Sequence, residues 1–338
     1  MKTQKQHEYR QDPISNEWVV VAGKRLDRPN NFKTITTPET KTDLSAVVDP
    51  LQPIVEERAE DEVVNMVLRD ADGVGQVYNV MNKFPLVSGE GTFDDTDEGP
   101  YQSYSGYGSH ELFVYREADQ PIRDFSVKKM DMMFEAFQKR SLEVMHDRTI
   151  RYVFVFHNHG KQAGATLKHP HSQLVASPIV PDGVERMVAG AEQYYVSNKR
   201  SVFSSIIDHE RDKSTRVVAE NDDFIALAPY ASKTAFEVEI LPKEHKPQFA
   251  FITPEERLQL AEMYKHVLEA QYRVLGEVDY NMYIYTAPCD GKDYRSFRWF
   301  VRLSPRVSIW GGYESGADMD VCTVFPEDAA SLLRGDKK

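Results

Sequence analysis

The strongest constraint on the fold is an order of predicted elements that occurs twice along the chain. In the first half, NKFPLVS leads to an alternating strand in HELFVYREADQPIRDFS, then to a helix, and then to the strands RYVFVFHN and KHPHSQLVASP. In the second half, NDDFIALAPYAS leads to FEVEILPKEHKPQFAFIT, then to a helix, and then to YNMYIYTAP and FRWFVRLSP. A repeated order of hairpin, strand, helix, strand and strand is typical of an α+β fold. We therefore expect two tandem units, each a mostly antiparallel sheet with a packed helix.

The two helices of the repeat have clear signals. The segment SVKKMDMMFEAFQKRSLEVMHD, residues 126–147, carries apolar side chains at helical spacing. The second helix begins in TPEERLQLAEMYKHVLEAQYRVL. There, Thr253 is the expected N-cap, Pro254 stands in the first turn and Glu256 completes a capping box. These signals predict a long helix in the middle of each unit.

The repeat divides the chain into three parts. We expect the first unit over residues 1–180 and the second over residues 217–338. The charged, partly helical segment 181–216 would connect them. The acidic segment GEGTFDDTDEG, residues 89–99, is rich in Gly and Asp and is expected to be a solvated loop.

Composition and charge exclude several classes of protein. The chain has 338 residues, 41% of them hydrophobic and 28% charged, which suits a globular protein with a sizeable core. Its net charge of −12 disfavours nucleic-acid binding. No apolar run is long enough for a membrane span, and the polar start MKTQKQHEYRQDP lacks the apolar region of a secretion signal. Cys289 and Cys322 form no CxxC pair or disulfide framework. A cytoplasmic protein is therefore expected.

The last strands of the two units differ in a way that packing alone does not require. HPHSQL in the first unit lies opposite RWFVRL in the second. In this alignment the first unit carries His169, His171 and Gln173. The corresponding residues of the second unit are Arg298, Phe300 and Arg302. Because only one copy carries imidazoles, we expect them to have a chemical role.

Residues His169 and His171 stand two apart on an extended segment, so we expect their side chains on one face of the sheet. Such a pair can bind zinc or copper, or one imidazole can react while the other supports it. A metal site needs further ligands, which His157 and His159 would supply only if the following turn brought them round. The pair could also be two buried histidines without a chemical role.

The neighbouring residues favour a nucleophile. An imidazole near its ordinary pKa of about 6.5 is neutral enough to attack phosphorus at neutral pH, and it leaves well from the phosphoramidate that forms. For this role Nε2 must be free, and an acceptor such as a backbone carbonyl must hold the Nδ1 proton. The small-residue loop GKQAGAT precedes the pair, and its backbone amides, including that of Gly164, are expected to reach phosphate oxygens. Neutral donors are also expected from Asn158, Thr166 and Gln173.

At these residues the sequence resembles the galactose-1-phosphate uridylyltransferase branch of the histidine-triad superfamily. The pattern N–HG–AGAT–HPHSQ is similar to its catalytic segment, DPISNEWVVVAGKRLDRP to its opening strand and Arg-rich turn, and NKFP to its nucleotide-side motif. The segment ENDDFIALAPYASKTAFEVEILPKEH resembles the start of its second half, whereas the closing GGYESG…VFPEDAA is closer to the ADP-glucose phosphorylase relatives. The resemblance runs nearly end to end. It implies two histidine-triad-like units, the second of them degenerate.

The resemblance implies roles for the residues of the catalytic segment. Carried over position by position, it makes His171 the nucleophile that accepts a nucleoside monophosphate, and His169 its supporting neighbour. Gln173 would hold the phosphoryl group, where the wider superfamily has a third histidine. The phosphates would be contacted by Asn158, Gly164 and Thr166.

The resemblance also implies substrate contacts outside that segment. Arg25 and Arg28 would meet the sugar phosphate, for which a guanidinium is well shaped. Asn82 would lie near the nucleotide. By the repeat, Arg302 would face the hexose phosphate, although an ion pair would equally account for this residue.

The chain departs from the family at its metal positions. Where relatives have a CPxC zinc knuckle it reads DPLQ, beginning at Asp49, and where they often have the His of DHS it reads ADQ, with Asp119. Where some relatives have a second metal site with HAH, it reads FVR. The usual Cys ligands of zinc are therefore absent. Asp49, Asp119 and His169 could hold a harder ion, but the simpler expectation is that hydrogen bonds replace the metal. We therefore assign no cofactor from the sequence, with zinc as the alternative although its usual Cys ligands are absent.

The resemblance implies a nucleotidyltransferase. It would move a nucleoside monophosphate, with UMP preferred, between a nucleotide sugar and a hexose 1-phosphate through a covalent nucleotidyl-histidine. The HPH pattern favours UDP-sugars, whereas the C-terminal segment favours an ADP-sugar phosphorylase that uses phosphate. A catalytically inactive nucleotide-sugar-binding protein and a dinucleoside polyphosphate hydrolase would also be compatible with the sequence. A homodimer is implied as well, with no nucleic-acid or membrane partner.

Overall fold

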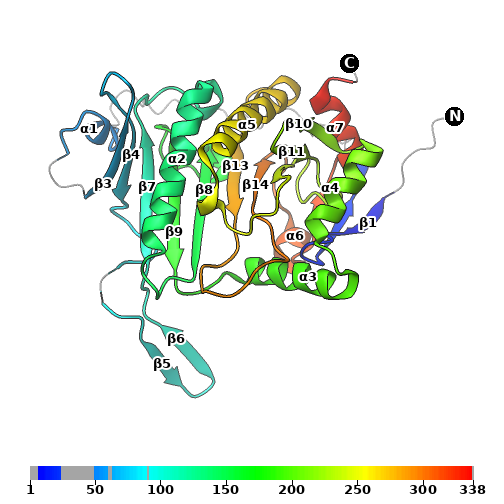
Figure 1. The fold of residues 1–338 in the computed structure, drawn as a ribbon, viewed down its shortest axis with the longest axis horizontal. Helices are drawn as coiled ribbons and strands as arrows, with labels where there is room; N and C mark the ends of the chain where they lie inside the picture. Colours follow the sequence, from blue (N-terminus) through cyan, green and yellow to red (C-terminus); the bar gives the residue numbers. More distant parts are fainter. Residues whose placement is uncertain (1–6, 24–48, 60–62, 90, 337–338) are drawn as a thin grey trace.

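A ten-stranded antiparallel sheet runs through the whole molecule (Figure 1). The structure is a computed structural model that describes residues 7–23, 49–59, 63–89 and 91–336. The strand order is β10-β11-β12-β14-β13-β8-β9-β7-β4-β3, and every neighbouring pair is antiparallel. The strands are β3 (Val64–Arg69), β4 (Gly75–Met81), β7 (Ser109–Tyr115), β8 (Tyr152–His159), β9 (His171–Ser177), β10 (Val217–Glu220), β11 (Phe224–Leu227), β12 (Val238–Pro242), β13 (Tyr280–Tyr285) and β14 (Phe300–Pro305).

The sheet consists of two copies of one arrangement, which confirms the predicted α+β fold. The order β3-β4-β7-β9-β8 in the first half corresponds to β10-β11-β12-β14-β13 in the second. The halves meet where β8 pairs with β13, and at that seam Phe156 lies opposite Tyr283. Gln173 of β9 pairs with Phe156, just as Arg302 of β14 pairs with Tyr283. Gln173 and Arg302 therefore occupy equivalent positions, as the sequence alignment of the two units predicts.

Two long helices cover one face of the sheet. Helices α2 (Val127–Val144) and α5 (Pro254–Leu275) lie side by side in front of the strands in Figure 1. Ser126 accepts a hydrogen bond from the Lys129 amide at the start of α2, and Thr253 and Glu256 form the predicted capping box of α5. The inner faces of these helices bury aromatic side chains, which pack edge to face, as Phe134 does with Phe137 and Tyr264.

The opposite face of the sheet is covered only in part. The helix α1 (Gln52–Val55) packs near β4 and β7, while α3 (Asp182–Asn198) and α4 (Val202–Lys213) pack over the second half. These last two helices account for most of the segment expected to connect the halves. Between the covered parts, the side chains of β8 and β9 on this face are left as the candidate site. Short 3₁₀ turns lie at Ile122–Asp124, Lys161–Ala163 and Phe249–Phe251.

Smaller elements complete the fold. A three-stranded sheet joins β1 (Glu8–Gln11), β2 (Trp18–Val21) and β15 (Asp320–Cys322), with α6 (Gly312–Ala317) and α7 (Pro326–Arg334) at the C-terminal end. The acidic segment predicted as a loop instead forms β5 (Asp95–Glu98), which pairs with β6 (Tyr101–Tyr104) in a hairpin that projects from the body (Figure 1). All of its paired residues are exposed, so cross-strand hydrogen bonding forms this hairpin without a buried face.

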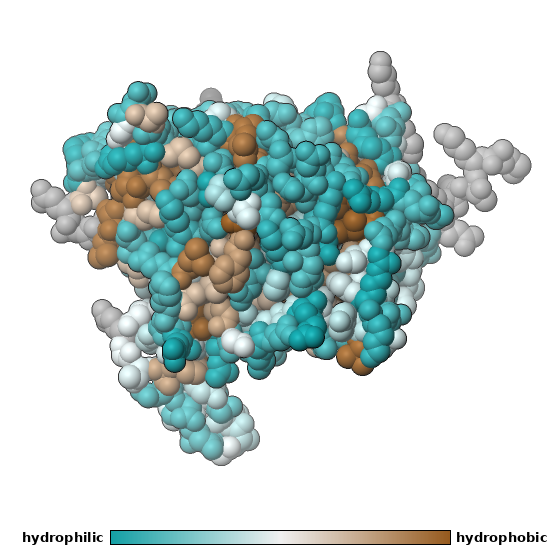
Figure 2. Space-filling view, viewed as in Figure 1, coloured by the Kyte–Doolittle hydropathy of each residue, from teal (hydrophilic) through white to brown (hydrophobic). Residues whose placement is uncertain are grey.

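The outer surface over α2 and α5 is mainly hydrophilic (Figure 2). Within the described ranges, no helix combines the length and apolar character needed to cross a membrane.

Candidate active site

The candidate site lies on the face of β8 and β9 that points away from α2. Successive side chains of β9 point to opposite faces of the sheet. Ser172 and Leu174 point toward the helices and are buried, whereas Gln173 points to the other face and is half-buried. His171 shares the face of Gln173 because the two stand two residues apart on the strand. Phe156 of β8 pairs with Gln173 and lies on the same face. The structure therefore brings His171 and Gln173 together, as predicted.

The orientation of the His171 ring is set by its own backbone neighbour. Its Nδ1 atom donates to the backbone carbonyl of His169 at 2.9 Å. This is the hydrogen bond that a nucleophilic imidazole requires, because it leaves Nε2 as the atom with the free lone pair. Within the described part of the chain, Nε2 has no hydrogen-bond partner. Burial lowers the pKa of His171 below its ordinary value of 6.5, so the ring is neutral at neutral pH.

The His169 ring is held by hydrogen bonds on both sides. Its Nδ1 lies 2.6 Å from Oδ2 of Asp49, and its Nε2 donates to the backbone carbonyl of Tyr115, also at 2.6 Å. His169 stands two residues before the start of β9, and its ring is buried beside Asp49. In this arrangement His169 provides the backbone carbonyl that accepts the hydrogen bond from Nδ1 of His171.

The same contacts test whether zinc fits here. Both nitrogens of His169 are already engaged, no thiolate is present, and Asp119 is exposed without a contact to the ring. Among the described residues, no three His, Cys, Asp or Glu side chains are grouped to hold a metal ion. The donor set at this position does not fit zinc, whose structural sites have four ligands.

The side-chain amide of Gln173 is oriented by a histidine that sequence reasoning missed. The Leu86 amide donates to Nδ1 of His110 at 3.0 Å, so this nitrogen is the acceptor and Nε2 carries the proton. Nε2 then donates to Oε1 of Gln173 at 2.9 Å. The Nε2 amide group of Gln173 is left without a partner among the described residues. Asn82 packs against the same ring, with its Nδ2 3.3–3.4 Å from the ring nitrogens, so it meets Gln173 only through His110.

On the other side of His171, Asn158 is oriented in a similar way. Asn281 of β13 donates from Nδ2 to Oδ1 of Asn158 at 2.7 Å and to the Ala163 carbonyl at 2.8 Å. The Nδ2 group of Asn158 therefore remains available as a donor. Gln173 on β9, the strand of His171, and Asn158 on the neighbouring strand β8 thus each have an amide N–H group left to donate. Neutral donors in such an arrangement suit the oxygens of a phosphate.

The loop before β9 contributes less than the sequence predicts. The amide of Gly164 donates to the Lys161 carbonyl at 3.1 Å, and the Ala165 amide donates to Gly160 at 3.0 Å. These amides close the loop and are not free for phosphate oxygens, which corrects the expectation for Gly164. Gly164 has φ 89°, a left-handed conformation that glycine adopts without strain. The turn thereby passes close to Asn158, whose Nδ2 lies 3.8 Å from the position that a Cβ on Gly164 would take.

Comparison with known protein families gives a match over the first half of the chain. Residues 1–181, more than half of the chain, match the family model for the N-terminal domain of galactose-1-phosphate uridyl transferase. The chain belongs to the galactose-1-phosphate uridyl transferase family. Residues 127–333 also match a domain of unknown function, DUF4921.

Relatives of this uridyl transferase family member span two named activities. An ADP-glucose phosphorylase of Arabidopsis thaliana is 26% identical over 97% of this chain and 92% of its own length. A galactose-1-phosphate uridylyltransferase of Thermotoga maritima is 26% identical over 97% of this chain and 98% of its own. The solved structure of an Arabidopsis ADP-glucose phosphorylase with bound ADP-glucose has the same fold, with a TM-score of 0.81, 24% identity and 98% coverage of both chains.

Of the remaining residues predicted for this family member, Thr166 and Arg302 lie in described parts of the chain. Arg25 and Arg28 lie outside the described residues. Thr166 is exposed, and its hydroxyl makes no hydrogen bond within the described chain. Arg302 lies in the second half, where its Nε donates to Glu239 at 3.0 Å. The ion pair that the sequence left open for Arg302 is present, and it is buried.

The histidines His157 and His159, which precede the turn, are structural. His157 points to the helix side, where Nδ1 donates to the His171 carbonyl at 2.9 Å, while Nε2 is buried and has no partner among the described residues. Burial lowers the pKa of His157 from 6.5 to about 3. His159 stacks on Tyr280 with ring centroids 5.0 Å apart. Neither ring reaches His169.

The buried His157 should make the fold sensitive to acid. The unfolded chain takes up a proton at this residue below pH 6.5, whereas the folded chain does so only near pH 3. Above pH 6.5 this residue does not lower the free energy of unfolding. Between pH 6.5 and pH 3 we expect the free energy of unfolding to fall by about 1.4 kcal/mol for each pH unit of acidification. Urea unfolding from pH 7.5 to 4.5 measures this slope. His157→Asn keeps a donor to His171 but does not titrate, so its slope should be shallower, whereas exposed His146→Asn should match the wild type. Parallel profiles for all three would contradict the assignment.

Proposed function

We propose that this protein transfers a nucleoside monophosphate through a covalent intermediate on Nε2 of His171. The observation that carries the proposal is the neutral His171 ring, held through Nδ1 and flanked by unpaired amide donors of Gln173 and Asn158. In the first step Nε2 bonds to the α-phosphorus of a nucleotide sugar, and the bond from that phosphorus to the hexose 1-phosphate oxygen breaks. In the second step an acceptor phosphate oxygen bonds to phosphorus and the bond to Nε2 breaks.

The chain's own residues supply positioning and charge stabilisation in both steps. Negative charge develops on the non-bridging oxygens of the α-phosphate, and the amides of Gln173 and Asn158 can donate to them. The leaving group is itself a phosphate, whose second pKa is about 6, so it departs without a strong acid. Asp49, the carboxylate of this region, is hydrogen-bonded to the ring of His169 at 2.6 Å. The proton stays on Nδ1, hydrogen-bonded to the His169 carbonyl, while positive charge grows on the ring.

For the nucleotide we propose UMP, exchanged between a UDP-sugar and a hexose 1-phosphate. The HPH pattern at His169–His171 and the full-length likeness to the Thermotoga uridylyltransferase support this choice. A second candidate, ADP-sugar phosphorylase activity, is favoured by the C-terminal segment and by the Arabidopsis relative.

A matrix of donors and acceptors tests the proposal. UDP-glucose, UDP-galactose and ADP-glucose are each combined with glucose 1-phosphate, galactose 1-phosphate, phosphate or water. We expect ping-pong kinetics and the fastest exchange with a UDP-sugar and a hexose 1-phosphate. ADP-glucose with phosphate as the fastest pair would replace our choice with the second candidate. Absence of transfer from every donor would leave a nucleotide-binding protein without this chemistry, and water as the best acceptor would indicate a hydrolase.

His110 is proposed as a positioning residue for Gln173. His110→Ala removes the donor to Oε1 and lets the amide rotate, so we expect kcat to fall about tenfold to a hundredfold with little change in KM. His110→Gln keeps a donor at a similar reach and should retain most of the activity. The double variant His110→Ala, Gln173→Ala should be no slower than Gln173→Ala alone, because His110 acts only through the Gln173 side chain that both variants lack. Additive losses would mean that His110 acts by another route.

We also propose that catalysis and folding need no metal. The carboxylate of Asp49 contacts His169 directly at 2.6 Å, in the place where the family has a zinc ligand set. Dialysis against a chelator should therefore leave both activity and the unfolding midpoint unchanged, and elemental analysis should find less than about one zinc per ten chains. Recovery of lost activity by added zinc would overturn this proposal.

A homodimer is proposed as the assembled form. Phe84 is 87% exposed and Leu86 73% exposed, two residues apart just after Asn82. Large apolar side chains gathered at the surface mark protein contacts. Light scattering should give twice the mass of one chain, and a monomer at micromolar concentration would refute the dimer.

A further inference from the structure

The second half of the sheet carries a cavity in the place that corresponds to the candidate active site. Its volume is about 240 Å³, and its wall includes Arg302, the counterpart of Gln173. The two residues stand in one row across four neighbouring strands, so they are roughly 14 Å apart, three strand spacings. Helix α3 closes the other side with Gly183, Arg186 and Met187. This cavity is separate from His171, none of whose neighbouring donors lines it.

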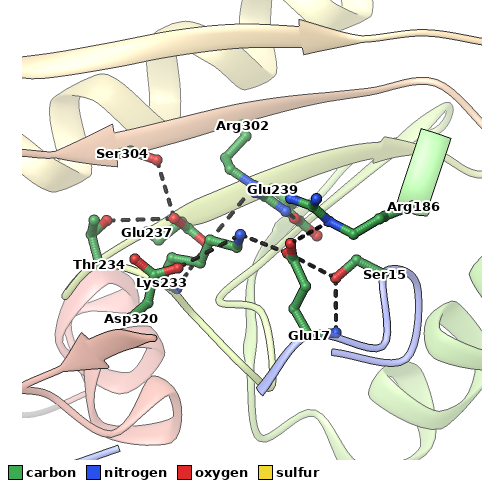
Figure 3. A network of polar contacts seen from close by, with 10 residues as sticks. All are labelled: Ser15, Glu17, Arg186, Lys233, Thr234, Glu237, Glu239, Arg302, Ser304 and Asp320. Carbon is green, nitrogen blue, oxygen red and sulfur yellow. Dashed lines mark hydrogen bonds and ion pairs between the residues drawn. The ribbon is translucent and has the colours of Figure 1, made fainter. Parts of the chain in front are cut away.

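One wall of the cavity is a network of charged groups from four different segments (Figure 3). Glu17 accepts from Nε of Arg186 at 3.0 Å and from Nζ of Lys233 at 2.7 Å. Ser15 contacts the same carboxylate at 3.1 Å. Asp320 lies 3.6 Å from Lys233. The cations that line this wall are thus already paired, and the exposed Arg186 marks the side that opens to solvent.

The floor combines aromatic rings with a buried ion pair. Tyr285 and Phe154 line the cavity, with ring centroids 5.9 Å apart, and the guanidinium carbon of Arg302 lies 5.1 Å from the Tyr285 centroid. Nε and Nη2 of Arg302 both donate to Oε1 of Glu239, at 3.0 and 2.5 Å. Burial raises the pKa of Glu239, and the charge of the neighbouring Arg302 guanidinium opposes this shift.

This lining selects a class of ligand. Carboxylates outnumber cations around the cavity once Glu237 and Glu239 behind Arg302 are included, so a free anion is not favoured. Glu17 and Glu239 are in ion pairs with Lys233 and Arg302, which reduces their attraction for an amine. A neutral molecule with many hydroxyl groups can donate to the carboxylates and accept from the cations while its C–H face covers the aromatic rings. The volume lies below the range of about 300–1,000 Å³ for drug-sized ligands, so the ligand is small.

We propose that this cavity is a second binding site, distinct from the nucleotidyl-transfer site, for a small uncharged polyhydroxylated molecule of the monosaccharide class. Its ligand contacts come from Glu17, Lys233 and Arg302, with Phe154 and Tyr285 as the stacking floor. The site lies on the same face of the sheet as His171. Phe154 stacks on Phe156 at 5.7 Å between centroids, and Phe156 is the neighbour of Gln173.

Titration calorimetry of the full chain tests the site with four probes: glucose, galactose, inorganic phosphate and putrescine. The blocking variant is Gly183→Phe, because a Cβ at Gly183 meets only Nη2 of Arg186, at 3.9 Å, and so enters open space. The second variant, Glu17→Gln, keeps the shape but removes the carboxylate that joins Arg186 and Lys233. We expect one or both hexoses to bind saturably, and about tenfold or more weakly in each variant. His171→Asn should bind the hexose as the wild type does.

The results that overturn the proposal are distinct. Hexose binding lost in His171→Asn but kept in Gly183→Phe would place the sugar at the nucleotidyl-transfer site. Phosphate that binds more tightly than hexose, and more tightly still in Glu17→Gln, would make the cavity an anion site. Putrescine as the tightest probe would make it an amine site, and absence of hexose binding in a folded wild type would remove the site. None of these outcomes depends on whether the protein transfers nucleotides.

Discussion

Replacing His171 by asparagine should abolish nucleotidyl transfer, with a loss of roughly 10⁴-fold or more in kcat. Asparagine can keep the donor to the His169 carbonyl that Nδ1 makes at 2.9 Å. It has no nitrogen lone pair that can attack phosphorus, because the amide lone pair is delocalised. The amides of Gln173 and Asn158 remain in place, so nucleotide binding should persist while the covalent step is lost. The variant therefore separates binding from chemistry.

Covalent labelling gives the direct measurement. UDP-glucose or ADP-glucose labelled in the α-phosphate is mixed with the protein, which is then denatured and counted. We expect label on the wild type and none on His171→Asn, with acid releasing the label and alkali retaining it, as for a phosphoramidate. His146→Asn is the matched control, because His146 is exposed at the end of α2 and takes no part in the site. A fully labelled His171→Asn protein would end the assignment of the nucleophile.

Local signals in the sequence predict much of the fold. The capping box at Thr253 follows from side chains that satisfy the first amides of their own helix, so no distant contact is needed. The register of β9 also follows, since alternation places His171 and Gln173 on one face. The equivalence of Gln173 and Arg302 can be predicted because duplication preserves spacing along each unit, and the strand pairings confirm it.

Long-range neighbours could not be predicted in the same way. His110 lies in a strand expected from its alternation, yet nothing local shows that β7 pairs with β9 and brings its ring to Gln173. Asn281 orients Asn158 only because the two halves join through β8 and β13. The prediction that the amides of GKQAGAT reach phosphate oxygens failed for Gly164 for a related reason. A glycine-rich sequence shows that a turn forms, but it does not show whether the amides point outward or close the turn on itself.

Removing the buried cation Arg140 should have the largest effect on stability. Nε and Nη2 of Arg140 donate to the two carboxylate oxygens of Glu111 at 2.9 and 2.6 Å, and the two side chains are 8% and 1% exposed. The pair ties α2 to β7, the strand that carries His110. Arg140→Met leaves the Glu111 carboxylate buried with only the hydroxyl of Ser109, so the free energy of unfolding should fall by about 3–5 kcal/mol.

Two controls show that this loss comes from the unpaired charge. Lys139→Met removes the neighbouring cation of the same helix, whose ion pair with Glu135 is half exposed, and should cost less than about 1 kcal/mol in urea unfolding. The double variant Arg140→Met, Glu111→Leu removes both charges and should recover most of the loss, because an apolar pair of similar volume needs no compensation. If the double variant were as unstable as Arg140→Met, packing of the arginine stem rather than the stranded carboxylate would hold α2 on the sheet.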